Sequence, residues 1–266
     1  MTFTALLMLV PLGLLSGLLA GLLGIGGGLV MVPVLLWWLP AHGVDQADAL
    51  HVAIASSLAA IVLTAAMSGW SHWRHGAVRL RLITWLAPAL LLGSFAATAL
   101  VATLPRSALQ VFVACFCAFA AWQLSRPRPS ASGDDVDQIA PVWLLAGGGV
   151  IGAISAAVGI GGGSLTVPFL AWRGVALPRA IATSAACGLP IAIAGTYGYL
   201  RLPTVDGLAG YGIGLVAINV ALVLGLASLA TAPLGARLAH RLPVPILRRI
   251  FAALLALIAA LLIVSR

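Results

Sequence analysis

One short glycine-rich stretch occurs twice in this chain, and this repetition constrains the fold more than any other feature. Residues 24–35 align with residues 159–170 at a constant offset of 135, and eight of the twelve aligned positions are identical. Each copy reads Gly-Ile-Gly-Gly-Gly and is followed, after three further residues, by Val-Pro. An internal duplication predicts that the same supersecondary unit is built twice, so we expect a fold of two related halves.

The segments around both glycine stretches are strongly apolar, which indicates a membrane protein. Hydrophobic residues make up 62% of the 266 residues and charged residues only 8%. A soluble domain of this length could not bury so much apolar surface, whereas runs of about 20 apolar residues match a hydrocarbon core of about 30 Å. In lipid every backbone polar group needs an internal partner, which a helix provides. We therefore predict an all-α polytopic membrane protein whose main partner is the lipid bilayer.

Each half is predicted to hold a helical hairpin broken at the glycine stretch, followed by three transmembrane helices. The segment after each glycine stretch is too short to cross, so the hairpin tip is expected within the membrane. A polar, Pro-containing linker at 126–140 separates a first repeat, 1–125, from a second repeat, 141–266. The predicted hairpins span 4–22 with 28–39 and 142–158 with 164–172, and the predicted crossing helices span 49–70, 82–103, 107–124, 179–200, 208–236 and 245–264.

The distribution of Arg predicts how the helices are oriented. Three crossings per half is an odd number, so the two repeats are inverted, and eleven of the fourteen Arg then lie on one side. If the first segment of each hairpin crossed completely, the Arg would divide seven against seven. The positive-inside rule favours the uneven division. It places the linker 126–140 in the cytoplasm and both termini in the periplasm.

The glycine stretches are the first candidate binding site. The short segment after each stretch begins at the loop, so its unpaired N–H groups and positive dipole end point to the midplane of the membrane. Helix N-termini bind anions, and glycine lets the backbone approach a ligand closely. The alternative is that these glycines only permit close helix packing. The glycines assigned to the anion site are Gly24, Gly26, Gly27, Gly28, Gly159, Gly161, Gly162 and Gly163.

Hydroxyl side chains at equivalent places in the two halves are the second candidate. Ser56 and Ser57 match Thr183 and Ser184 at an offset of 127. Such hydroxyls donate hydrogen bonds either to the oxygens of a bound anion or to neighbouring helices, and the two interpretations stay open. Ser164, with Thr166, follows the second glycine stretch only and is a candidate on that copy alone.

Two further polar residues are candidates for coupling or substrate contact. His51 lies near Asp48 at the outer end of its helix, and imidazole titrates near neutral pH; an interfacial role is the alternative. Asn219 is expected deep in the helix at 208–236, where it pairs with another side chain or contacts the substrate. No Asp, Glu, Lys or Arg is expected at mid-membrane, which argues against a buried carboxylate for Na⁺ or H⁺ coupling.

Several other functions lack the residues that they need. The net charge of +8 is explained by Arg acting as topology signals, not by nucleic-acid binding. The glycine stretches lack the G-x-G-x-x-G spacing, and no Lys follows as in a P-loop. No nucleophile with a base and no cluster of metal ligands occurs at a recognisable spacing. We therefore expect neither an enzyme nor a bound metal or cofactor.

The doubled G-x-G-G-G-x-x-x-V-P motif, the Ser/Thr-Ser pair downstream in each half and the Leu-Pro before the last helix of each half resemble the sulfite exporter TauE/SafE family. The resemblance covers essentially the whole chain, and it places Pro33 and Pro168 in the core motif beside the glycines. It implies a multi-pass permease of the bacterial inner membrane for sulfite and related sulfur-containing anions such as organosulfonates.

Combining motif and resemblance, we expect a secondary transporter that holds a small anion at the midplane between the two glycine loops. A passive anion channel is the nearer alternative. A membrane-embedded enzyme or an assembly factor is the more distant one.

Overall fold

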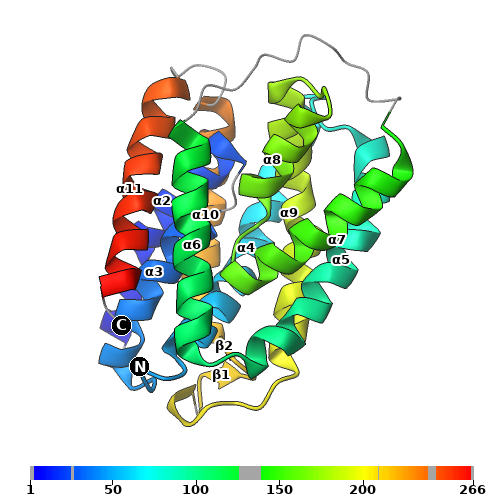
Figure 1. The fold of residues 1–266 in the computed structure, drawn as a ribbon. Coiled ribbons are helices and arrows are strands. Elements are labelled where there is room, and N and C mark those ends of the chain that lie inside the picture. Colours follow the sequence, from blue (N-terminus) through cyan, green and yellow to red (C-terminus); the bar gives the residue numbers. More distant parts are fainter. Residues whose placement is uncertain (1–2, 25–26, 126–138, 209, 239–243, 265–266) are drawn as a thin grey trace.

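The structure is a computed structural model of residues 1–266, and it describes every residue except 1–2, 25–26, 126–138, 209, 239–243 and 265–266. The predicted linker therefore lies almost entirely outside the described residues. The described part of the chain forms a bundle of helices with one short hairpin of two strands (Figure 1).

The helices follow the same order in the two halves, with α2 to α6 corresponding in turn to α7 to α11. The first half contains α1 (Phe3–Leu7), α2 (Val10–Leu23), α3 (Gly28–Trp38), the 3₁₀ turn η1 (Pro40–His42), α4 (Ala49–Arg74), α5 (Leu80–Thr103) and α6 (Arg106–Ser125). The second half contains α7 (Pro141–Val158), α8 (Gly163–Trp172), α9 (Leu177–Leu200), the 3₁₀ turn η3 (Asp206–Leu208), β1 (Gly212–Ile213), β2 (Val216–Ala217), α10 (Ile218–Leu238) and α11 (Val244–Val264).

Each helical hairpin breaks where glycines adopt a left-handed backbone. Gly24 ends α2 with φ +66°, and Gly159 ends α7 with φ +77°. Gly27 and Gly162, with φ +58° and +74°, lie directly before α3 and α8. The left-handed region costs a residue with a side chain about 1–2 kcal/mol. The glycines therefore let the chain leave one helix and start the next within a few residues.

The prediction of an all-α polytopic membrane protein is confirmed. Within the described residues, six helices are long and apolar enough to cross a membrane, namely Thr4–Leu22, α4, α5, α7, α9 and α10. This set includes the first segment of each hairpin and omits α6 and α11, so it differs from the expected crossing helices. The 18 residues of α7 span about 27 Å at 1.5 Å per residue, close to the thickness of the hydrocarbon core. Length alone therefore does not decide how deep a hairpin reaches.

The helix predicted at 208–236 begins later than expected. The chain first forms η3 and then an antiparallel pair of two-residue strands, with Gly212 opposite Ala217, and α10 starts only at Ile218. Gly210 and Gly214 have positive φ values of +87° and +58°. These conformations interrupt a helix, and the apolar composition of the segment concealed the interruption.

In each hairpin, the first helix packs on a helix of the other half and the second helix packs on a helix of its own half. α2 packs on α10, and its counterpart α7 packs on α5; α3 packs on α4, and its counterpart α8 packs on α9. The long helices α4 and α9 contact each other in the interior, while α6 and α11 lie side by side (Figure 1). In the same view the start of α1 and the end of α11 lie at one end of the bundle, and α6 ends and α7 begins at the other.

Candidate functional site

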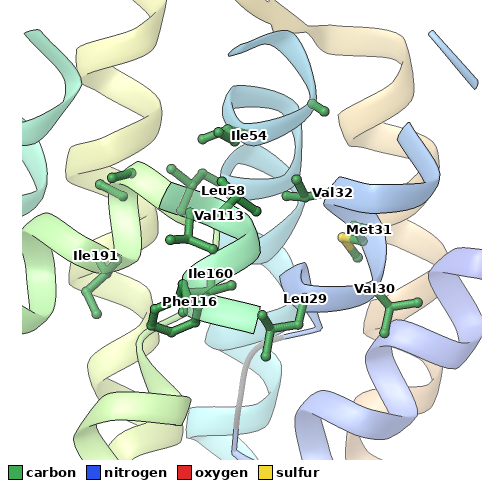
Figure 2. Packing of buried hydrophobic residues seen from close by; sticks show 14 of the residues in the cluster. Leu29, Val30, Met31, Val32, Ile54, Leu58, Val113, Phe116, Ile160 and Ile191 are labelled. Carbon is green, nitrogen blue, oxygen red and sulfur yellow. The ribbon is translucent and has the colours of Figure 1, made fainter. Parts of the chain in front are cut away.

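The two glycine loops meet inside the bundle. A Cβ atom placed on Gly28, the first residue of α3, would lie 2.1 Å from the carbonyl oxygen of Gly159, the residue after α7. This distance leaves room only for glycine, so the backbones of the two halves are in direct contact here. The carbonyl end of α7 thus faces the N-terminal end of α3. Ile54 of α4 lies beside Gly159, and Ile61 of the same helix lies beside Gly28. The buried apolar side chains of this region include Leu29 of α3, Leu58 of α4 and Ile160 (Figure 2).

Ser57 and Ser184 bridge the halves at these loops. The Ser57 hydroxyl lies 2.9 Å from the carbonyl oxygen of Gly159, to which it donates, and 2.8 Å from that of Ile54 in its own helix. The Ser184 hydroxyl donates to the carbonyl oxygen of Gly24 at 3.4 Å. The last carbonyls of a helix have no partner within the helix. Each serine therefore serves the end of the broken helix of the other half in this conformation.

Ser56 and Thr183 also connect the halves, but as acceptors. The N–H of Ala217, which precedes α10, donates to Ser56 Oγ at 2.9 Å. The N–H of Arg79, which precedes α5, donates to Thr183 Oγ1 at 3.1 Å. The structure thus brings all four predicted hydroxyls to the boundary between the halves and gives each a backbone partner.

Among the described residues of the second half, four hydroxyl oxygens are buried without a hydrogen-bond partner, namely those of Ser155, Ser164 and Thr166 on the hairpin and that of Thr196 in α9. A Cβ atom built on Gly162 would lie 3.4 Å from both Ser155 Oγ and Thr166 Oγ1. Sequence reasoning did not select Ser155. Its only signal is a serine in an apolar helix, four residues before the glycine stretch.

In the first half, Ser16 of α2 is the buried hydroxyl near the glycine loop that has no partner. A Cβ atom on Gly27 would lie 3.0 Å from Ser16 Cβ. Sequence reasoning missed this residue too. The positions equivalent to Ser164 and Thr166 hold Leu29 and Met31, both buried.

The two candidates for coupling lie elsewhere. His51 is 9% exposed, and its Nε2 lies 3.2 Å from the carbonyl oxygen of Val101 in α5, to which it donates. Asn219 is the second residue of α10 and is exposed, because the helix begins at Ile218. The expectation that Asn219 lies deep in a helix is therefore wrong, since the preceding residues form the strand pair.

The buried polar side chains of the described residues are hydroxyls, two His and one Gln, and no charged side chain belongs to this set. Within the same residues there is no group of three or more His, Cys, Asp or Glu that could hold a metal ion. Within the described residues, the buried polar groups inside the bundle are therefore N–H groups, hydroxyls, imidazoles, one amide and helix termini.

The chain is similar to known membrane proteins over nearly its whole length. A family model described as "Sulfite exporter TauE/SafE" matches residues 9–262. A protein of Haemophilus influenzae named "Probable membrane transporter protein" is 34% identical over 264 residues, 97% of each chain. A probable membrane transporter protein of Methanocaldococcus jannaschii is 27% identical over 242 residues, covering 88% of this chain and 86% of its own. No solved structure matches the chain.

Proposed function

The chain belongs to the sulfite exporter TauE/SafE family, is a membrane transporter and not an enzyme, and we propose that it carries small sulfur-containing anions such as sulfite or organosulfonates across the bacterial inner membrane. The anion binds between the two glycine loops, and the two halves move around it as a secondary transporter. A membrane protein with broken helices in matching positions of two halves commonly binds its substrate there.

One observation carries this proposal: the two loops contact each other inside the bundle, with Gly28 against the carbonyl of Gly159. The short helix α3 begins at this contact, and α8 begins four residues after Gly159, at Gly163. Unpaired N–H groups and a positive dipole end lie at the start of each. Two helix N-termini thus begin within a few residues of one contact between the loops, in a bundle without buried charges among its described residues, and this region is the best place for an anion.

The pairing of helices supports an inverted arrangement of the two repeats, with both termini in the periplasm. α2 on α10 mirrors α7 on α5, and α4 on α10 mirrors α9 on α5, as two symmetry-related repeats would require. The first half starts at one end of the bundle and the second half starts at the other (Figure 1), which favours an axis in the membrane plane over one along its normal. Residues 75–79, between α4 and α5, belong to the connections that carry most of the Arg, and we assign this end to the cytoplasm.

Uptake and efflux of labelled sulfite, thiosulfate and methanesulfonate by proteoliposomes test the proposal. We expect saturable flux of at least one of these anions, with protein-free liposomes as the baseline, and a dependence on an imposed pH gradient if protons are coupled. Accelerated exchange, in which unlabelled anion on the far side speeds entry of label, identifies a carrier. Flux that neither saturates nor shows exchange would identify a passive channel, and absence of flux for all three anions would refute the proposal.

A further inference from the structure

Two buried hydroxyls beside the second glycine loop make no hydrogen bond among the described residues. Ser155 of α7 and Thr166 of α8 are both 0% exposed, and neither hydroxyl oxygen has a hydrogen-bond partner. A buried hydroxyl without a partner is costly, and most such groups are satisfied in folded proteins. A buried hydroxyl without a hydrogen-bond partner in a transporter therefore indicates a place where a ligand can accept the bond.

Both hydroxyls converge on the start of α8. A methyl carbon built on Gly162, the residue before α8, would lie 3.4 Å from both Ser155 Oγ and Thr166 Oγ1, and 2.3 Å from Cδ1 of the flexible Ile191 side chain, which must turn away to admit an anion at this point. The N–H groups of Gly163 and Ser164 belong to the first turn of this ten-residue helix, where N–H groups have no partner within the helix. Two hydroxyl donors and the N-terminus of a helix thus share one small region.

The side chain of Ser164, which the sequence made a candidate for anion binding, does not share the face of Thr166. It lies two residues before Thr166, and residues two apart point roughly 200° away from each other around a helix with 3.6 residues per turn. The pair of side chains that share the loop face is therefore Ser155 and Thr166. Ser164 contributes its backbone N–H.

The first half has no equivalent pair of donors. At the offset of 135, the counterparts of Ser155 and Thr166 are Ala20 and Met31, which are 2% and 0% exposed and donate no side-chain hydrogen bond. The carbonyl oxygen of Gly159 already faces the first residue of α3. A carbonyl oxygen at a helix N-terminus occupies the position that an anion would take.

We propose that the substrate anion is bound by the second half, with Ser155 and Thr166 donating hydrogen bonds to two oxygens of a small oxyanion seated at the N-terminus of α8. The equivalent positions of the first half, Ala20 and Met31, supply no side-chain donor. Sulfite and the head group of a sulfonate both offer three oxygens on one sulfur, so the shared SO₃ group is the recognised chemistry. This inference rests on the proposed function and adds to it the half and the residues that bind.

The test is anion binding and flux with matched variants of the purified, reconstituted protein. Thr166→Val and Ser155→Ala should each raise the Kd for sulfite, or the KM for its flux, about tenfold, whereas Thr166→Ser should keep the affinity within about twofold. Since the hydroxyl of Thr166 has no hydrogen-bond partner within the protein, Thr166→Val should not lower the unfolding temperature measured without added anion. Ser16→Ala removes the unpartnered hydroxyl beside the first loop and should leave the affinity unchanged.

Each other outcome decides against the inference. Unchanged affinity in the double variant Ser155→Ala, Thr166→Val, with normal wild-type flux, refutes the site and leaves the transport function standing. An equal loss of affinity in Ser16→Ala means that both loops bind the anion through side chains. A Thr166→Val protein that unfolds at lower temperature but binds sulfite normally shows that the hydroxyl is structural. Wild-type protein that neither binds nor transports sulfite or methanesulfonate refutes the proposed function and this inference with it.

Discussion

The two glycine loops consist of the same five residues but lie in different surroundings. At the first loop, Gly28 packs against the carbonyl oxygen of Gly159, and the next turn of α3 carries buried apolar side chains. At the second loop, the start of α8 carries Ser164 and Thr166, and Ser155 of α7 lies close by. Duplication has kept the backbone of the motif, whose positive φ values require glycine, while the side chains around it differ. The chemistry of the two halves can thus differ although their geometry is repeated.

The hydroxyls that bridge the halves differ as well, though less. Ser57 reaches the carbonyl of Gly159 at 2.9 Å, whereas Ser184 reaches that of Gly24 at 3.4 Å. The first contact is a well-formed hydrogen bond and the second lies at the edge of what counts as one. We expect α7 to be held more firmly against α4 than α2 is against α9.

The largest expected effect is an all-or-none difference in labelling. Equivalent connections of the two halves should be accessible from opposite sides of the membrane. Ala77, between α4 and α5, and the exposed Asp206, between α9 and α10, lie at corresponding places. In a protein whose three native Cys have been replaced, Ala77→Cys should react with a membrane-impermeant maleimide only from the cytoplasm and Asp206→Cys only from the periplasm. Whole cells and inside-out vesicles provide the two readings. Reaction of both residues from one side would mean that the repeats are not inverted.

Alanine substitutions at Gly28 and Gly162 should have different effects on stability, because the added carbon meets backbone at Gly28 and a flexible side chain at Gly162. Gly28→Ala places a carbon 2.1 Å from a backbone oxygen, so the halves must move apart, transport should be lost and the unfolding temperature should fall. Gly162→Ala meets the end of the flexible Ile191 side chain at 2.3 Å and a positive φ of +74°, a strain of about 1–2 kcal/mol. It should also abolish transport, with a smaller fall in unfolding temperature.

Thermal unfolding in detergent, followed by intrinsic fluorescence, ranks the two glycine variants, and flux in proteoliposomes reports transport. Gly149→Ala in α7 is the matched control, because a Cβ atom there meets nothing within 4 Å. A Gly28→Ala protein with the stability and flux of the wild type would show that the two loops are not in the contact described here.

The smallest expected effect is the difference between the two bridging serines. Ser57→Ala leaves the buried carbonyl of Gly159 without its cross-half donor and should cost about 1–3 kcal/mol of unfolding free energy. Ser184→Ala removes a longer bond and should cost less, about 0.5–1 kcal/mol. Ser125→Ala, at an exposed helix end, should stay within about 0.5 kcal/mol of the wild type. Denaturant titration in mixed micelles measures all three, and equal losses for Ser57 and Ser184 would contradict the distances.

Most of the architecture could be predicted from the sequence, because it depends on local properties. Apolar runs of helical length require a membrane, and Gly-Ile-Gly-Gly-Gly requires a break, wherever the rest of the chain lies. The predicted segment at 28–39 is observed as Gly28–Trp38 and that at 164–172 as Gly163–Trp172. The start of α10 was misjudged because the strand pair before it is as apolar as a helix, and Asn219 was misplaced for the same reason.

The sequence by itself therefore determined the class of protein, the broken hairpins and the equivalence of Ser56-Ser57 with Thr183-Ser184. Only the tertiary structure decided what these hydroxyls contact. Ser57 finds its acceptor 102 residues away, at the residue that follows a helix of the other half. A helical pattern shows which residues share a face but not what the opposite helix presents to them. Ser155 could not be selected from the sequence for the same reason. It becomes a candidate only in the folded protein, where α7 and α8 bring it beside Gly162 and Thr166.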